Sequence, residues 1–161
     1  MLGREAPISR WSSLVDRLPR FADGLVSVQD LAAQYAAPLL DLRAGQRVLD
    51  ACAAPGGKTG HVAQLMENLG TIVACDRDLE RLQVLKKNIA RLGVSIAHIL
   101  RHDWSRGRVP SEIASVAPFD RILIDAPCTN TGVMRRRVDL KWRLRRTDFD
   151  RMHRGQIEIV R

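Results

Sequence analysis

The sequence is short of cysteine and of long apolar runs, and each shortage excludes a class of protein. Its three cysteines, Cys52, Cys75 and Cys128, are too few and too unevenly spaced for a disulfide framework. None of the four histidines stands at a metal-ligand spacing from them, so we expect reduced thiols and no metal site. No apolar run approaches the ~20 residues that span a bilayer, and no signal-peptide pattern follows Met1. We therefore expect a soluble, cytoplasmic protein with no membrane partner.

Two nucleotide-binding fingerprints are also missing. Gly57-Lys58-Thr59 matches the end of a phosphate-binding P-loop, but Cys52 replaces the glycine that this motif needs five positions before Gly57. Pro55 also removes a backbone N–H from the loop that would bind phosphate. The dinucleotide pattern Gly-x-Gly-x-x-Gly is absent as well. The sequence therefore disfavours a nucleotide hydrolase.

Positive charge is abundant, and it is concentrated near the C-terminus. The 161 residues include 26 Lys and Arg against 18 Asp and Glu, a net charge of +8. Residues 135–161 hold ten of the basic and four of the acidic residues, so +6 of that charge lies there. A localised basic block indicates a polyanionic partner, most commonly a nucleic acid. The alternative is a solvated helical face without a partner.

Alternating strand and helix patterns predict an α/β fold with a parallel sheet, since crossovers of this length are right-handed. We expect strands at residues 47–52, 71–76, 96–100 and 119–125, helices at 57–69 and 78–92, and one helical turn at 111–116. Residues 1–24 form an N-terminal extension with a short amphipathic helix between Trp11 and Phe21. A helix after Ser27 stops or kinks at Pro38. A loop over 126–139 and a helix over about 147–160 complete the chain.

The stretch from Asp50 to Thr59 is a turn of small residues between the first strand and its helix. Small side chains let the backbone approach a ligand closely, and the N–H groups of the helix start face the same space. Three acids follow later strands: Asp76, Asp103 and Asp125. The carboxyl ends of parallel strands meet at the edge where open α/β sheets bind ligands. The sequence therefore predicts a binding site at this edge.

Each of these positions also has an ordinary interpretation. Asp76 stands where an acid accepts hydrogen bonds from ribose hydroxyls, but it can equally cap the following helix. Asp103 could reach an adenine amino group, although aspartates are common in loops. Cys128 lies beside a proline at the mouth of the expected cleft, where Arg135 to Arg137 would favour its thiolate. The alternative for Cys128 is a half-buried, unreactive thiol.

Residues 50–59 (DACAAPGGKT) and 125–132 (DAPCTNTG) together resemble the two main motifs of the RsmB/Sun/NOP family of RNA cytosine-5 methyltransferases, closest to its bacterial ribosomal-RNA branch. Residues 24–30 and 135–142 support the resemblance, which covers roughly residues 20–161. It implies a Rossmann-like, S-adenosylmethionine-dependent methyltransferase fold with an incomplete parallel sheet in the order 3-2-1-4. Residues 25–161 would be part of a catalytic domain.

The resemblance also implies the residues of a cofactor site. The methionine and ribose portions of S-adenosylmethionine would be surrounded by Cys52, Ala53, Ala54, Pro55, Gly56, Gly57 and Lys58. Asp76 would hold the ribose hydroxyls, Asp103 the adenine, and Asp125 would line the place where cofactor and cytosine meet. Ribosomal RNA would contact the basic block through Arg135, Arg136, Arg137, Lys141 and Arg143.

In the family that the chain resembles, a cysteine thiolate attacks carbon 6 of a cytosine that has left its stack, and carbon 5 then accepts the methyl group. A second cysteine assists removal of the carbon 5 proton, and Cys128 matches it. Asp125 would hydrogen-bond the cytosine ring as charge develops. The chain departs from the family at Thr129-Asn130, where Ser-Gly is usual. It also contains neither the later Thr-Cys-Ser motif of the nucleophile nor the family's N-terminal RNA-binding domain.

We therefore expect a truncated rRNA (cytosine-5)-methyltransferase that is inactive alone. Two alternatives stay open: a non-catalytic RNA-binding module with a vestigial cofactor pocket, and an enzyme active with a separate chain that carries the nucleophile. With only four strands, the fourth would lie at an uncovered edge. An open apolar edge predicts self-association, or poor order over residues 126–161.

Overall fold

The computed structural model describes residues 15–106, 108–135 and 137–161, and a four-stranded parallel sheet in the order β3-β2-β1-β4 organises them. The strands are β1 (Arg47–Asp50), β2 (Thr71–Asp76), β3 (Ala97–Arg101) and β4 (Arg121–Leu123). The helices are α2 (Leu31–Gln34), α3 (Gly57–Leu65), α4 (Leu79–Arg91), α5 (Ser111–Ala114), α6 (Leu140–Arg143) and α7 (Arg146–Val160), with single turns η1 (Pro38–Leu40) and η2 (Thr131–Val133). The predicted α/β class and the strand order 3-2-1-4 are confirmed.

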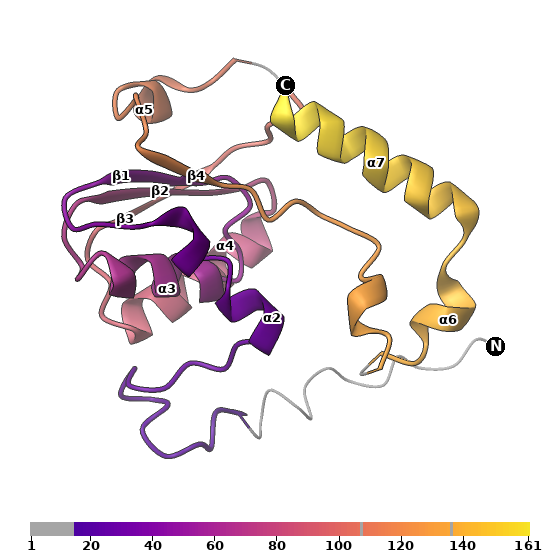
Figure 1. Ribbon diagram of the computed structural model, residues 1–161, viewed down its shortest axis with the longest axis horizontal. Helices are drawn as coiled ribbons and strands as arrows, with labels where there is room; N and C mark the ends of the chain where they lie inside the picture. The colour runs from indigo at the N-terminus through magenta and orange to yellow at the C-terminus, as the bar shows by residue number, and fades with distance from the viewer. Residues whose placement is uncertain (1–14, 107, 136) are drawn as a thin grey trace.

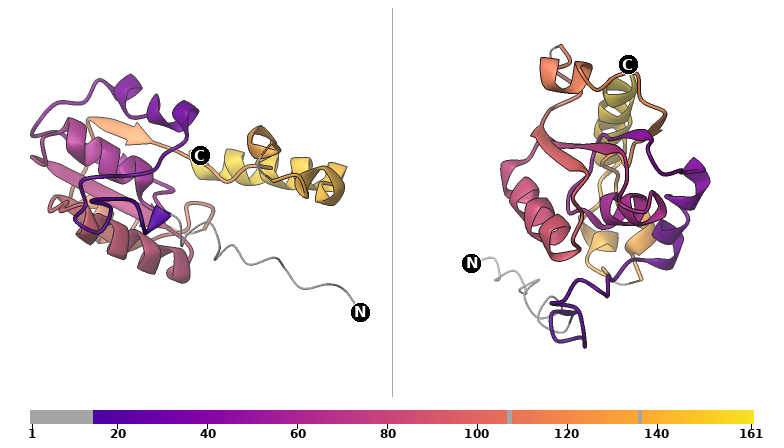
Figure 2. Two further views of the ribbon diagram at one scale, coloured as in Figure 1. Left: turned by 90° about the horizontal axis from the view of Figure 1, so that it is seen from below. Right: turned by 90° about the vertical axis from the view of Figure 1, so that its left-hand side faces the viewer.

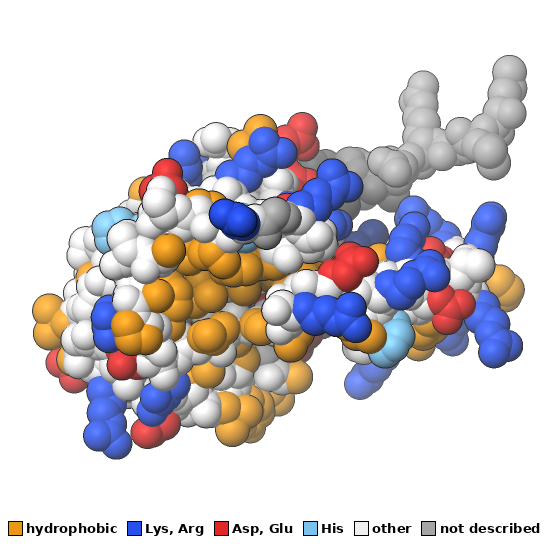
Figure 3. Space-filling view, turned by 90° about the horizontal axis from the view of Figure 1, so that it is seen from above, with side chains coloured by type: hydrophobic (Ala, Val, Ile, Leu, Met, Phe, Trp, Pro, Cys, Tyr) orange, Lys and Arg blue, Asp and Glu red, His pale blue; other side chains and the backbone are white. Residues whose placement is uncertain are grey.

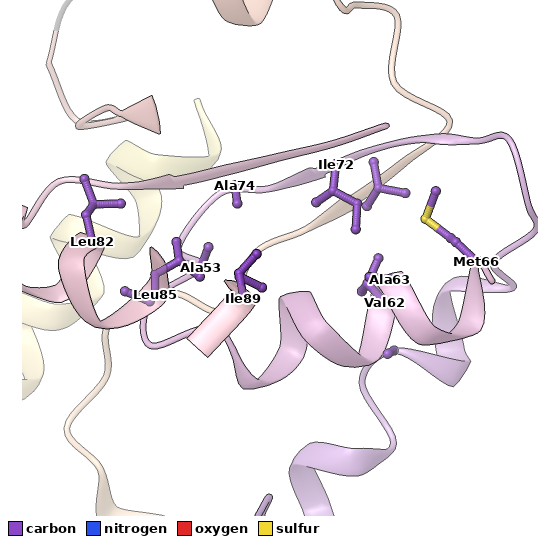
Figure 4. Close-up of a cluster of buried hydrophobic side chains, with 12 residues drawn as sticks. Ala53, Val62, Ala63, Met66, Ile72, Ala74, Leu82, Leu85 and Ile89 are labelled. Carbon is purple, nitrogen blue, oxygen red and sulfur yellow. The ribbon is translucent and has the colours of Figure 1, made fainter. Parts of the chain in front are cut away.

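Successive side chains of a strand point to opposite sides of the sheet, and at the centre of this sheet both sides are buried. Val48 and its register partner Ile72 pack against α3 and α4. Figure 4 shows Ile72 pointing from the sheet toward Val62 and Ala63 of α3. Leu49 and its partner Val73 face the other way and pack with Ile113 of α5. Figure 1 accordingly shows α3 and α4 on one side of the sheet and α5 on the other. This layering fixes the carboxyl ends of the strands at one edge.

The boundaries of the two long helices, α3 and α4, are set by a capping side chain and by residues of positive φ. The carboxylate of Asp78 accepts hydrogen bonds from the backbone N–H groups of Glu80 and Arg81, so Asp78 is the N-cap of α4. α3 ends at Leu65, four residues earlier than predicted, because Glu67 and Asn68 both adopt positive φ. The Asn68 side chain stabilises that turn by bonding the loop that precedes β3.

Other boundaries differ from the sequence prediction in understandable ways. β4 spans three residues rather than seven, because its register with β1 covers only Val48 to Asp50. One backbone hydrogen bond extends the pairing at each end, from Asp120 N to Arg47 O at 2.8 Å and from Ala51 N to Leu123 O at 2.9 Å. α2 ends at Gln34, four residues before the stop or kink expected at Pro38, and Pro38 opens the single turn η1 instead. The short helix α6 falls in a region for which no element was predicted. The amphipathic helix expected near Trp11 begins outside the described residues, and residues 16–24 form turns.

The C-terminal helices lie beside the sheet rather than on it. Figures 1 and 2 show α6 and the start of α7 far from the sheet, while the C-terminal end of α7 returns close to it. The side-chain amide of Gln156 in α7 donates a hydrogen bond of 2.9 Å to the backbone oxygen of Pro127. α7 is thereby tied to the loop that follows β4. None of the described helices combines the length and the apolar character needed to cross a membrane.

Candidate functional site

One pocket at the carboxyl edge of the sheet collects residues from the ends of all four strands. Its lining includes Cys52, Asp76, Asp103, Asp125 and Cys128, the positions that sequence analysis placed at the strand ends. The opposite wall is α7, through Arg151, Met152, Arg154, Gly155, Glu158 and Ile159. We call this space the strand-end pocket. The sequence analysis did not predict that α7 would form this wall, because no local pattern encodes the direction in which residues 126–161 fold.

A second space, the α3 pocket, lies between residues 24–29, α3 and residues 92–94. Its polar lining consists of amide, hydroxyl and imidazole groups, from Ser27, Gln29, Gln34, His61, Gln64 and Asn68. None of the strand-end acids reaches it. The chemistry expected from the sequence is therefore concentrated in the strand-end pocket.

The small-residue turn is held by a buried carboxyl group at the end of β1. Asp50 is 1% exposed, and Thr59 Oγ1 donates a 2.7 Å hydrogen bond to its Oδ2. Burial raises the Asp50 pKa to about 6, although the Thr59 bond opposes the rise. Gly56 has φ +101°, and a Cβ there would lie 2.7 Å from a leucine side chain of α4. Only glycine suits that combination of backbone and packing.

The turn residues predicted for the cofactor do not all face the same space. Cys52 lines the strand-end pocket, and Lys58 reaches it by an ion pair with Asp125. Ala53, Ala54 and Gly56 are buried, and Pro55 is exposed. Gly57 lines the α3 pocket instead. The backbone of the turn, rather than its side chains, is therefore what most of these residues contribute.

Asp76 connects the turn to β2 and is itself almost fully buried, with 4% exposure. Its Oδ2 accepts from the N–H of Ala54 at 3.3 Å, and its Oδ1 from the N–H of Asp78 at 3.0 Å. Arg81 lies 3.4 Å from Oδ2 and also donates to the carbonyl of Ala54. The helix cap proposed as the ordinary role of Asp76 belongs to Asp78. Arg81 belongs to no sequence motif, and the sequence analysis did not predict its contact with Asp76.

Asp103 stands after β3 in a compact turn. Its Oδ1 accepts from Ser105 Oγ at 2.7 Å and from Ser105 N at 3.1 Å, and these bonds hold the pKa of Asp103 below its ordinary value. The neighbouring Trp104 donates its indole N–H to the carbonyl of Ala51 at 2.8 Å and packs edge-on against His102. Trp104 therefore fixes the Asp103 turn to the end of β1, a role that sequence analysis missed.

The segment after β4 contributes Asp125 and Cys128 to the pocket. Lys58 Nζ lies 2.6 Å from Asp125 Oδ2, so a cation from the first turn meets the acid after β4. Cys128 is exposed, and its sulfur accepts a hydrogen bond of 3.3 Å from the N–H of Asn130. Asn130 adopts φ 57°, a left-handed conformation that asparagine tolerates. Asparagine at this position therefore allows a left-handed turn after Cys128.

The other two cysteines differ from Cys128 in their surroundings. Burial, reinforced by the nearby Asp76 and Asp50, raises the pKa of Cys52 to about 11. Cys75 is buried in β2, and burial raises its pKa to about 12. Neither thiol ionises readily near neutral pH, and Cys128 is the one exposed cysteine of the three. Among the described residues, no three His, Cys, Asp or Glu side chains gather where they could hold a metal ion.

The basic residues predicted to bind RNA lie between η2 and the end of α6. Arg135, Arg137, Lys141 and Arg143 are exposed, and none of them lines the strand-end pocket. Arg143 pairs with Asp139 at 3.3 Å. Arg136 lies outside the described residues. Two other basic residues of the C-terminal block, Arg151 and Arg154 of α7, do line the pocket. The sequence analysis did not name them as RNA-binding residues.

Sequence relatives match most of this chain. Residues 37–161 match the family described as 16S rRNA methyltransferase RsmB/F. A protein of Coxiella burnetii, named as a probable ribosomal RNA small subunit methyltransferase B, is 42% identical over 154 residues, which cover 91% of this chain and 34% of that protein. The chain spans about a third of the length of the curated relatives it matches.

Solved structures agree with the sequence relatives. The crystal structure of NSun6 from Pyrococcus horikoshii with SFG has a TM-score of 0.77 at 33% identity, covering 90% of this chain and 36% of that one. A SAM-dependent O-methyltransferase from Thermotoga maritima shares the fold at 20% identity and a TM-score of 0.53, covering 72% of this chain and 40% of that one. The fold is the Rossmann-like fold of S-adenosylmethionine-dependent methyltransferases. The chain belongs to the RsmB/F family of 16S rRNA methyltransferases.

Proposed function

We propose that this chain supplies the S-adenosylmethionine-binding part of an enzyme that methylates carbon 5 of cytosine in ribosomal RNA. The observation that carries the proposal is the convergence of Cys52, Asp76, Asp103, Asp125 and Cys128 on the strand-end pocket. Membership of the family supports the reaction, and the similar NSun6 structure contains SFG, an analogue of this cofactor. Residues 25–161 form the catalytic-domain part, and residues 1–24 are an extension.

The polar groups of the pocket suit this cofactor. A nucleoside needs hydrogen-bond acceptors for its ribose hydroxyls and for the amino group of its adenine, and carboxylates are strong acceptors. Asp103 remains ionised because its pKa is lowered, and it is partly exposed in the pocket. Asp76 is held in place by backbone N–H groups and Arg81, so its orientation is fixed in advance. We assign the adenine to Asp103 and the ribose to Asp76.

The pocket also holds groups for the transfer step, for which bound S-adenosylmethionine supplies the methyl group. Asp125 would hydrogen-bond the cytosine ring, with Lys58 at 2.6 Å fixing the position of its carboxylate. Cys128, exposed three residues later, would take the carbon 5 proton in the release step. The cytosine must leave its stack to reach either side chain. Neither Cys52 nor Cys75 is suited to attack carbon 6, since burial raises both pKa values.

Calorimetry with S-adenosylhomocysteine tests the cofactor assignment. We expect saturable binding to the wild-type chain, and binding about tenfold weaker for Asp103→Ala, which removes one hydrogen-bond acceptor worth about 1–1.5 kcal/mol. Glu112→Ala, an exposed acid on α5 outside the pocket, is the matched control and should leave the affinity unchanged. Absence of binding at millimolar ligand would remove the cofactor assignment.

Transfer of a tritiated methyl group to ribosomal RNA tests the division of labour between the cysteines. We propose that residues 1–161 alone do not methylate RNA, because none of the three cysteines matches the nucleophile motif. Methylation by this chain alone that disappears in Cys128→Ala would contradict that statement, because Cys128 would then serve as the nucleophile. We also propose a cytoplasmic location, because ribosomal RNA is the proposed substrate.

We also propose that two copies of this chain associate through the edge of β4. Among the described strands β4 pairs only with β1, so its outer edge is open. Ile122, the register partner of Leu49, is 52% exposed on the face that carries α5. Figure 3 shows hydrophobic side chains gathered over the middle of that face. Sedimentation equilibrium should give a dimer that Ile122→Lys dissociates, and a wild-type monomer would contradict it.

A further inference from the structure

One face of α7 forms the wall of the strand-end pocket opposite the strand ends. Arg151, Met152, Arg154, Gly155, Glu158 and Ile159 line the pocket, at spacings of one, three, four, seven and eight residues from Arg151. These spacings place the six residues on one side of an α-helix. The bond from Gln156 to the carbonyl of Pro127 fixes that side next to the Cys128 loop. This face of α7 is therefore part of the site.

The wall contains two arginines in different electrostatic situations. Arg151 is neutralised by Asp148, whose carboxylate lies 2.8 Å away on the same helix. Arg154 forms no ion pair or hydrogen bond with any residue that the structure describes, although Glu158 is one turn further along. An exposed guanidinium without a carboxylate partner has all five N–H donors available to a ligand. Arg154 is thus the arginine of the α7 wall that has no carboxylate partner among the described residues.

The distribution of charge indicates what that cation binds. The acids Asp76, Asp103 and Asp125 all lie at the strand ends, where they suit hydroxyl and amino groups. Arg154 stands on the opposite wall and lines the same pocket as the exposed Cys128, which would face the incoming base. A nucleotide that enters between the two walls brings a phosphodiester on its backbone, and arginine binds phosphate oxygens through its planar fork of donors. Met152 and Ile159 provide apolar surface beside it.

From this geometry we infer that Arg154 binds a backbone phosphate of the RNA strand whose cytosine enters the strand-end pocket. The inference rests on the proposed function for the identity of the base, whereas the phosphate contact itself requires only Arg154 and RNA in the strand-end pocket. It extends the RNA-binding surface from the exposed block at 135–143 into the pocket. Arg154 is a substrate-binding residue here, and no proton transfer is assigned to it.

The test measures binding of a short fluorescein-labelled, cytidine-containing single-stranded RNA by anisotropy, from about 50 to 200 mM KCl. One phosphate contact in single-stranded RNA contributes about 0.7 to the slope of log K against log salt. We expect Arg154→Ala to weaken binding several-fold at low salt and to reduce the slope by about 0.7. Arg154→Lys should retain the slope. Arg146→Ala, on the same helix but outside the pocket, is the matched control and should change the slope less.

A second measurement locates the contact. RNA bound in the pocket should slow alkylation of the exposed Cys128 by iodoacetamide in the wild type and in Arg146→Ala. In Arg154→Ala the same RNA concentration should protect Cys128 less, while the rate without RNA stays the same. Circular dichroism should show that the variants are folded, because the Arg154 side chain is exposed.

The outcomes separate this inference from the proposed function. Unchanged RNA affinity, salt slope and Cys128 protection in Arg154→Ala would overturn the phosphate contact, whether or not S-adenosylhomocysteine binds. A large loss of S-adenosylhomocysteine affinity in Arg154→Ala, with RNA binding unchanged, would assign Arg154 to the cofactor and also overturn it. Failure of the wild-type chain to bind S-adenosylhomocysteine refutes the proposed function alone, and the RNA measurements then still decide on Arg154.

Discussion

Replacing Asp50 by asparagine should remove a pH dependence of stability that the fold builds into its first turn. Asp50 is buried at the end of β1, and one of its two carboxyl oxygens, Oδ1, has no hydrogen-bond partner among the described residues. Burial raises its pKa from 3.8 to about 6. Asparagine has nearly the same size and keeps an oxygen for Thr59, but it does not titrate.

The sign of the effect follows from the direction of the pKa change. Between pH 4 and pH 6 the folded state holds a proton on Asp50 that the unfolded chain has already lost, so stability falls as pH rises. The gap between 3.8 and about 6 corresponds to about 3 kcal/mol, at about 1.4 kcal/mol per pKa unit. Asp103, with a lowered pKa, acts below about pH 4 and in the opposite direction, so the two windows are separate.

Urea unfolding followed by circular dichroism from about pH 4 to 7 measures this difference. The free energy of unfolding of the wild type, minus that of Asp50→Asn, should fall by about 3 kcal/mol over the range. An unpaired amide N–H in the variant would add a constant offset of about 1–3 kcal/mol and would leave the slope unchanged. Asp139→Asn, at an exposed position, is the control and should run parallel to the wild type. Parallel curves for wild type and Asp50→Asn would refute the reasoning.

Two further predictions concern the turn and the thiols. Gly56→Ala should destabilise the fold by about 1–3 kcal/mol, because it places a Cβ at φ +101° and 2.7 Å from a leucine of α4. The control Gly57→Ala, whose Cβ would meet nothing within 4 Å, should leave the stability unchanged. Equal urea midpoints for the two variants would contradict the prediction. Iodoacetamide at pH 8 should modify Cys128 first, since a pKa of about 11 instead of 9.0 reduces the Cys52 thiolate about a hundredfold; mass spectrometry showing equal labelling would contradict the burial of Cys52 and Cys75.

The fold was largely predictable because its signals are local and repeated. β2 was predicted to the residue, since the apolar run from Ile72 to Cys75 after Gly70 is typical of a strand buried on both faces. The end of α3 was not, because Glu67 and Asn68 leave the helix to meet the loop before β3, and that contact is tertiary. Periodicity alone continued the helix through both residues.

The site was predictable where topology brings strand ends together and unpredictable where the chain folds back. Asp76, Asp103 and Asp125 meet because parallel strands end at a common edge. Trp104, Arg81 and the face of α7 that carries Arg154 reach the same pocket through side-chain length and loop direction, which no local pattern encodes.

Hydrogen–deuterium exchange with and without saturating S-adenosylhomocysteine tests the central claim most directly, because it reports both whether the ligand binds and where. The account predicts slower exchange in the turn at 52–58 and in the segments after β2, β3 and β4, which contain Asp76, Asp103 and Asp125. The α3 pocket, around residues 24–29 and 92–94, should show no change. No protection anywhere, or protection confined to the α3 pocket, would contradict the assignment of the strand-end pocket as the cofactor site.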